Sequence, residues 1–156
     1  MIRPECEQIL ALAEDYAVIP VCKEIYADMM TPISMLIRLS AISQRYYLLE
    51  SVEGGEKWGR YSFLGYDPIM RVSCKDGKVT IESDRATKVV ETEKPLTVLR
   101  NILKTYKAPK LPDMPPFTGG FVGHFSYGMI GYAEPTLKLK SGEFEDYDFM
   151  LFDKII

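Results

Sequence analysis

The feature that most restricts the fold of this chain is the Asp-Gly pair at positions 76 and 77. It separates two segments of strand character, residues 69–75 and residues 78–83. Aspartate and glycine tolerate the positive φ angles that a two-residue type I′ turn requires, and this turn joins antiparallel strands. The pair therefore predicts a β-hairpin, and with it an antiparallel sheet.

Other patterns predict three helices and several more strands. Thr31 and Pro32 are typical of a helix start, a hydroxyl cap followed by proline at the first helical position. The predicted helix ends near Ser40, with Ile33, Leu36 and Ile37 as its buried stripe. Spacing of apolar residues predicts further helices over 4–16 and 94–106. Apolar runs predict strands over 17–25, 46–51, 61–64, 120–127 and 148–156.

This order of elements defines the expected fold class. Helices and strands do not alternate regularly, which favours an α+β fold with a largely antiparallel β-sheet and flanking helices over a doubly wound sheet. The length of 156 residues is that of one ordinary domain. The sequence ends inside an apolar strand, FMLFDKII, whereas chain termini are more often polar. We therefore expect the chain to be part of a larger protein.

Composition excludes several classes of function. The net charge of −3 argues against a nucleic-acid-binding protein, which normally carries a basic excess. One histidine and three widely spaced cysteines leave a zinc site, a hydrolytic triad or a disulfide framework hard to build. No apolar stretch is long enough to span a membrane and no signal peptide is visible. We expect a cytoplasmic protein with reduced thiols.

Three segments contain side chains suited to chemistry. Glu50 and Ser51 end a predicted strand and offer a carboxylate and a hydroxyl at the rim of an apolar pocket, as a small amphipathic ligand needs. An ordinary strand end is the alternative, favoured from periodicity alone. The glycines of GGFVGH, residues 119–124, favour close backbone approach in a sheet, and His124 a structural role. Glu143, Glu145, Asp146 and Asp148 suit acid–base work or Mg²⁺, but a solvated loop is the better interpretation.

The segment LLESVEGGEKWGRYSFLG, residues 48–65, closely resembles the N-terminal region of anthranilate synthase component I. Thr31-Pro32-Ile33-Ser34 resembles the TP-x-S segment of that family, and residues 119–123 resemble its GG-x-x-G strand. The similarity covers nearly the whole chain. Two departures are Gly128, where the family often has an acidic residue, and His124, where an aromatic is more usual.

The resemblance implies a fold, a site and partners. The chain would be one part of that family's larger two-subdomain α/β sandwich, with residues 1–156 forming its regulatory, tryptophan-binding domain. In the family, the LLES and RYSF segments belong to an allosteric pocket for L-tryptophan. By position, this pocket would involve Leu49, Glu50, Ser51, Lys57, Arg60, Tyr61, Ser62 and Phe63.

The resemblance also implies an activity for the intact enzyme, a lyase that converts chorismate to anthranilate and pyruvate with Mg²⁺. Ammonia would come from a glutamine amidotransferase subunit, component II. The catalytic region would lie outside this chain, so we expect the isolated chain to be inactive, to hold no cofactor and to self-associate. Two alternatives remain open: part of an amino-deoxychorismate synthase component, and a free-standing, non-catalytic amino-acid sensor or assembly module.

Overall fold

The computed structural model describes residues 2–50, 61–112, 114–134, 136–137, 139 and 142–156. Its internal contacts divide the chain into two compact units. Unit 1 contains residues 1–68, 107–119 and 152–156, and unit 2 contains residues 69–106 and 120–151. Each unit is described separately below.

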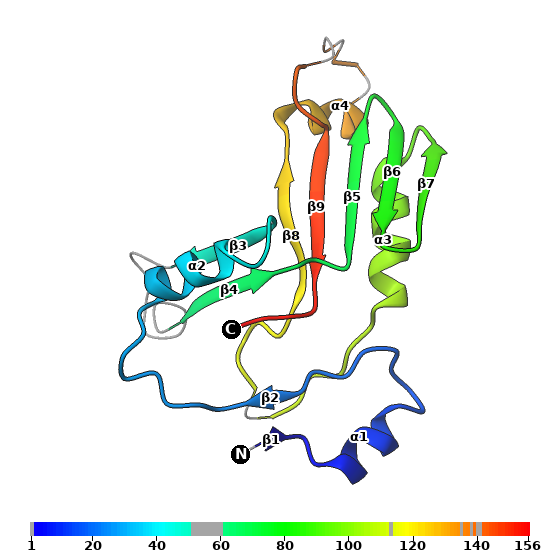
Figure 1. Ribbon diagram of the computed structural model, residues 1–156. Helices are drawn as coiled ribbons and strands as arrows, with labels where there is room; N and C mark the ends of the chain where they lie inside the picture. Colours follow the sequence, from blue (N-terminus) through cyan, green and yellow to red (C-terminus); the bar gives the residue numbers. More distant parts are fainter. Residues whose placement is uncertain (1, 51–60, 113, 135, 138, 140–141) are drawn as a thin grey trace. The chain divides into compact units, whose positions relative to one another are not determined.

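Unit 2 is built on a five-stranded sheet of order β7-β6-β5-β9-β8 (Figure 1). Strand β5 pairs antiparallel with β6 and β9, β6 pairs antiparallel with β7, and the arrows of β8 and β9 run in opposite directions. The strands are β5 (Met70–Lys75), β6 (Lys78–Ser83), β7 (Ala86–Glu91), β8 (Gly120–Phe125) and β9 (Tyr147–Phe152), the last of which ends in unit 1.

The Asp-Gly turn forms as predicted. Asp76 and Gly77 have φ angles of 49° and 78°, so both central residues adopt the left-handed conformation of a type I′ turn. This turn sets the register of β5 and β6, in which Cys74 lies opposite Val79. The α+β class with a mostly antiparallel sheet is confirmed.

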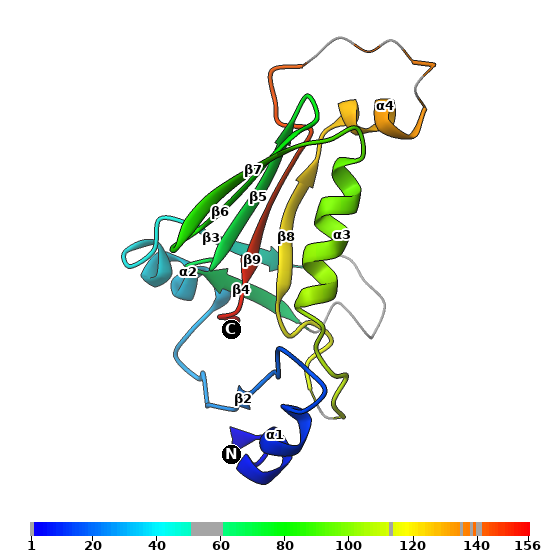
Figure 2. The same cartoon turned by 90° about the vertical axis from the view of Figure 1, so that its right-hand side faces the viewer.

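The core of unit 2 lies between one face of this sheet and helix α3 (Pro95–Thr105). Figure 2 shows α3 lying along the sheet. Val72, Cys74 and Tyr147 are fully buried on that face, and Leu99 packs against them from the helix. The Tyr147 hydroxyl donates a hydrogen bond to the Pro95 carbonyl (3.2 Å), which ties the first turn of the helix to β9.

A short helical segment follows β8. It consists of a 3₁₀ turn η1 (Tyr127–Met129) and helix α4 (Ile130–Ala133). Gly123 on β8 approaches the β9 backbone so closely that a Cβ added there would meet the Asp148 carbonyl oxygen at 2.0 Å. The predicted close backbone approach in this glycine-rich strand is therefore confirmed.

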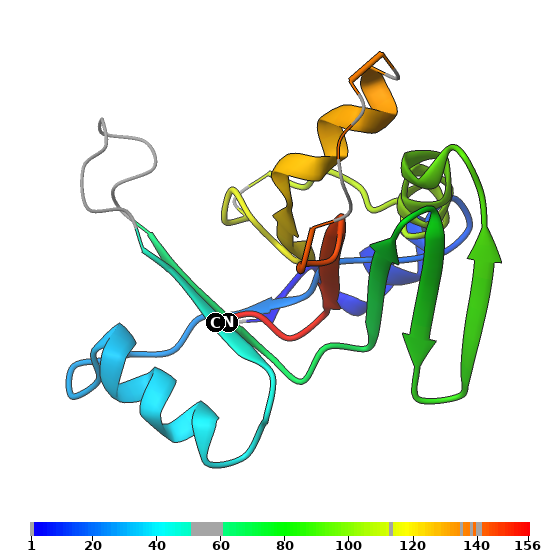
Figure 3. The same ribbon diagram turned by 90° about the horizontal axis from the view of Figure 1, so that it is seen from above.

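The described residues of unit 1 form two small antiparallel sheets and two helices. Strands β3 and β4 pair with Leu48 opposite Leu64, and helix α2 packs on this hairpin (Figure 3). Leu39, Leu64 and Phe152 are its most buried apolar side chains. The elements are β1 (Ile2–Arg3), α1 (Cys6–Leu12), β2 (Cys22–Lys23), α2 (Pro32–Ser40), β3 (Tyr46–Glu50) and β4 (Ser62–Tyr66).

Helix α2 begins where predicted but buries a different face. Ile33 and Ile37 are 60% and 66% exposed, whereas Leu39 is buried. Both faces of α2 carry apolar residues, so their spacing alone did not identify the packed side. The strand predicted over 17–25 is also mostly wrong, because only Cys22–Lys23 pairs with another strand.

Candidate functional site

A cavity of about 660 Å³ lies entirely within unit 1. This volume is in the range of about 300–1,000 Å³ typical of small-molecule sites. Three segments far apart in the sequence line it, together with the last residues of the chain. The described lining residues are 20–25, 27, 30–32, 35, 61–64, 114, 115, 117, 118, 153, 155 and 156.

Aromatic rings form one side of this cavity. Tyr61 and Phe63 lie with ring centroids 5.8 Å apart and planes nearly parallel, at 15°. Phe63 also meets Phe117 edge to face, with centroids 5.5 Å apart. Such rings give a flat apolar surface against which another aromatic group can pack.

The Thr31 cap positions a second wall. The Thr31 hydroxyl accepts a hydrogen bond from the Ser34 backbone N–H (3.1 Å), and the Ser34 hydroxyl accepts one from the Thr31 N–H (2.9 Å). This reciprocal pair satisfies two backbone donors and fixes where α2 begins. Thr31, Pro32 and Met35 consequently face the same cavity as the β4 residues.

The last residues of the chain complete the site. Leu64 and Ile156 exchange two backbone hydrogen bonds of 2.8 and 2.9 Å, so the terminal segment runs beside β4. Lys154 donates to the Asp67 carboxylate (2.6 Å), which secures the same segment, and this contact raises the pKa of Lys154. Asp153 and Ile155 are thereby held at the cavity wall.

Polar groups at the cavity are few, which suits a ligand with one polar end. They include Thr31, Ser62, Thr118, Lys23 and the carboxylates of Glu24 and Asp153. Glu24 is ion-paired with Arg3. A mostly apolar wall with a few hydroxyls and carboxylates can take an aromatic body and orient an amino-acid head.

The eight residues predicted for the tryptophan pocket fall into three groups. Tyr61, Ser62 and Phe63 line the cavity. Leu49 and Glu50 pair with Phe63 and Ser62 across the β3–β4 hairpin but do not line the cavity. The Ser62 hydroxyl donates a hydrogen bond to the Glu50 carboxylate (3.4 Å). Ser51, Lys57 and Arg60 lie outside the described residues.

Sequence reasoning missed the contributions of residues 20–25 and of the segment around Met114 and Phe117. The three prolines of residues 110–116 predict an extended linker there. Met114, between two of these prolines, and Phe117, directly after them, were the signal that the segment packs against other residues.

Two predictions about other polar residues are wrong. His124 is exposed on β8 rather than satisfied in an apolar core. Asp146 and Asp148 are not simply solvated. The Asp148 carboxylate accepts two hydrogen bonds of 2.7 and 2.9 Å from the Arg71 guanidinium, which raises the pKa of Arg71. The Asp146 carboxylate accepts a hydrogen bond from the Tyr132 hydroxyl (2.8 Å). Their partners are distant in sequence, so the local polar pattern did not identify them.

No metal cluster occurs among the described residues, since no three histidine, cysteine or acidic side chains gather there as ligands. All three cysteines are free, and Cys74 is buried. The described helices are too short and too polar to cross a bilayer.

Comparison with known proteins identifies the relatives of the chain. It is 36% identical to anthranilate synthase component 1 of Acetivibrio thermocellus over its entire length, which covers 32% of that protein. It is 41% identical to the Pseudomonas aeruginosa protein of the same name, over 84% of this chain and 27% of that one. The chain is homologous to anthranilate synthase component 1. It spans about a third of the length of these relatives, and no protein-family model matches it.

The fold is shared with this enzyme component. The crystal structure of anthranilate synthase component I from Streptococcus pneumoniae superimposes with a TM-score of 0.50 and 23% identity, over 86% of this chain and 28% of that one. The α+β architecture of the chain is thus that of a part of anthranilate synthase component I.

Proposed function

We propose that this chain is the N-terminal, regulatory region of an anthranilate synthase component 1 and contributes its binding site for L-tryptophan. One observation carries the proposal: two of the segments that resemble the family, Thr31-Pro32 and Tyr61-Ser62-Phe63, line a single cavity. They are about thirty residues apart in sequence, and because they line one cavity, a single ligand could contact both.

The chemistry of the cavity suits this ligand. The Phe63 and Phe117 rings offer an aromatic surface for an indole, and a buried aromatic pair is worth about 0.5–1.5 kcal/mol beyond its area. The Ser62 hydroxyl can bond the amino-acid head, and the carboxylate of Asp153 can compensate its ammonium. Leu49, Glu50, Ser51, Lys57 and Arg60 would support the same pocket from the hairpin and its connection.

The activity belongs to the intact enzyme. There, chorismate and ammonia would give anthranilate and pyruvate, with ammonia supplied by the glutamine amidotransferase of component 2 in the cytoplasm. This chain supplies no catalytic residue in our proposal and is inactive alone. Tryptophan bound in unit 1 would favour a less active state of the enzyme, a coupling between two sites.

A titration calorimetry experiment tests the ligand. The 156-residue chain should bind L-tryptophan in preference to L-alanine, which has the same polar head and no indole. Ser62→Phe should abolish binding by filling the cavity, whereas Ser83→Phe, which adds the same ring at the exposed end of β6, should leave it unchanged. Equal binding by the two variants would place the ligand elsewhere.

A chimera tests the regulatory role. The corresponding third of a tryptophan-inhibited relative is replaced by this chain, and anthranilate formation is followed by fluorescence. We expect an active enzyme that tryptophan inhibits, and Ser51→Phe should retain activity while losing inhibition. An active chimera that tryptophan does not inhibit would refute the regulatory role. The product of the full-length enzyme that contains this chain, anthranilate or amino-deoxychorismate, separates the proposal from the folate-pathway alternative.

A further inference from the structure

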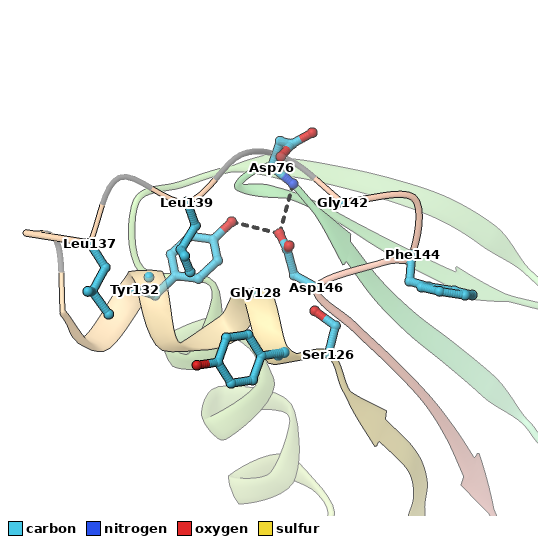
Figure 4. Close-up of a pocket in the computed structure, with 11 residues that line it drawn as sticks. Asp76, Ser126, Gly128, Tyr132, Leu137, Leu139, Gly142, Phe144 and Asp146 are labelled. Carbon is cyan, nitrogen blue, oxygen red and sulfur yellow. Dashed lines mark hydrogen bonds between the residues drawn. The ribbon is translucent and has the colours of Figure 1, made fainter.

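Unit 2 has a cavity of its own, of about 500 Å³, at the end of the sheet where β5 turns and β8 ends. Figure 4 shows it bounded by the η1–α4 segment on one side and by the segment that leads into β9 on the other. No described residue that lines the cavity of unit 1 lines this one. Its described lining residues are Asp76, Ser126, Tyr127, Gly128, Gly131, Tyr132, Leu137, Leu139, Gly142, Phe144 and Asp146.

The floor of this cavity carries a fixed carboxylate. The Asp146 Oδ2 atom accepts hydrogen bonds from the Tyr132 hydroxyl (2.8 Å) and the Asp76 backbone N–H (2.8 Å), both drawn in Figure 4. Burial raises the pKa of Tyr132, so this hydroxyl remains a donor. Within the part of the chain that the structure describes, no basic side chain lies within ion-pair distance of Asp146. Its neutral donors orient the carboxylate without compensating its charge.

The walls are apolar and aromatic. Tyr127 and Phe144 are 84% and 75% exposed, and Leu137 and Leu139 are also exposed. The described lining residues include no lysine, arginine or histidine, and the Lys75 ammonium beside the cavity is held by the carbonyls of Gly142 and Phe144. Aromatic rings beside a carboxylate attract a cation through both ring quadrupole and charge.

Gly128 leaves space next to this carboxylate. A Cβ added to Gly128 would lie 3.6 Å from the Asp146 Oδ1 atom and 3.4 Å from the Ser126 hydroxyl. These are ordinary van der Waals distances, so alanine fits at this position but occupies the space. The other carboxylate oxygen, Oδ2, takes the bonds from Tyr132 and Asp76, which leaves Oδ1 facing the cavity side at Gly128.

We propose that this cavity is a second ligand site, which takes a compact organic cation, an ammonium or guanidinium group on an apolar frame. The cation would pair with Asp146 Oδ1 over Gly128, and its frame would pack on Tyr127 and the leucines. Such a group occurs in small amines and in the arginine side chain of a partner protein, and the test separates these sources.

The test uses a charged probe and its neutral analogue. Benzamidine and benzamide have nearly the same shape, but only benzamidine is a cation. Benzamidine added to the 156-residue chain should shift the amide NMR signals of Gly128 and Gly131 saturably, and benzamide should bind at least about tenfold more weakly. Equal binding, or no saturable shift with either cation tested, would overturn the proposal. Tighter binding of Nα-acetyl-arginine methylamide than of benzamidine would assign the site to a partner's arginine, and the reverse order to a small amine.

Two variants locate the site. Gly128→Ala should weaken benzamidine binding about tenfold by occupying the space beside the carboxylate. Thr87→Ser, which also changes one methyl group but at an exposed position of β7 outside the cavity lining, should retain the binding of the unmodified chain. If the two variants bind benzamidine equally, the cation does not sit at Asp146. Asp146→Asn, which retains an acceptor oxygen and loses the charge, should also weaken binding.

Discussion

Removal of the Tyr47 hydroxyl is expected to stabilise the protein. This is the reverse of the usual result for a buried tyrosine. Its ring lies on β3 against Gly65, where an added Cβ would come within 2.2 Å of the ring, and edge to face on Phe152 with centroids 4.7 Å apart. The hydroxyl is buried and has no hydrogen-bond partner among the described residues. The packing thus depends on the ring and not on the oxygen.

The expected gain in stability follows from the missing hydrogen bond of the Tyr47 hydroxyl. An unsatisfied buried polar group costs about 1–3 kcal/mol, and the void left by one oxygen offsets part of the gain. Tyr47→Phe should therefore raise the free energy of unfolding by about 1 kcal/mol, or the melting temperature by about 2–4 °C for a chain of this size. Urea unfolding followed by circular dichroism measures it.

Tyr147 provides the matched control. Its buried hydroxyl donates to the Pro95 carbonyl (3.2 Å), so Tyr147→Phe breaks a real bond and should lower stability by about 1 kcal/mol. The two Tyr→Phe changes should therefore have opposite signs. A stability loss in Tyr47→Phe equal to that in Tyr147→Phe would refute the reasoning about the Tyr47 hydroxyl.

The same hydroxyl predicts a pH dependence. Burial raises the pKa of Tyr47 to about 12, from about 10 in the unfolded chain. Between these values the unfolded state has lost the proton that the folded state retains, so stability falls as pH rises. The slope is at most about 1.4 kcal/mol per pH unit, and less because the ring is only partly buried. Tyr47→Phe should flatten the stability curve between pH 10 and 12, and an unchanged curve would contradict the assignment.

Two further substitutions test the fold. Gly123→Ala should destabilise unit 2 by about 3 kcal/mol or more, because its Cβ would meet the Asp148 carbonyl at 2.0 Å, and a melting curve like that of the unmodified chain would contradict this close approach. Thr31→Ala should cost about 1 kcal/mol in urea unfolding by removing the α2 cap, while Thr31→Ser should remain within a few tenths. Equal losses in both Thr31 variants would show that the hydroxyl is not the stabilising group.

The parts of the fold that were predictable depend on local chemistry. The turn at Asp76-Gly77 and the α2 start at Thr31 each follow from two or three adjacent residues, and both are confirmed. Strand β7 (Ala86–Glu91) was not predicted, because the turn before it, at Asp84-Arg85, has neither glycine nor proline. Its pairing with β6 is decided by the neighbouring strand.

The candidate site was predictable only in part, for a similar reason. The hairpin residues Tyr61 to Phe63 came from a motif that is contiguous in sequence. The opposite walls come from residues 20–25 and 114–118 and from the terminal segment, which meet β4 only in the folded unit. Periodicity describes one element at a time, so it cannot indicate which distant segments face each other across a cavity.

The position of β9 has a consequence for synthesis of the chain on the ribosome. Although β9 is the last strand in the sequence, it lies between β5 and β8, with Tyr147 opposite Cys74. The β5–β6 hairpin can form as soon as it emerges, but β5 then presents an unpaired edge until some seventy further residues have been translated. An exposed strand edge is a template for pairing with other chains. Translation that stops before Tyr147 should therefore give a product prone to aggregation, and one that a chaperone covering this edge would protect.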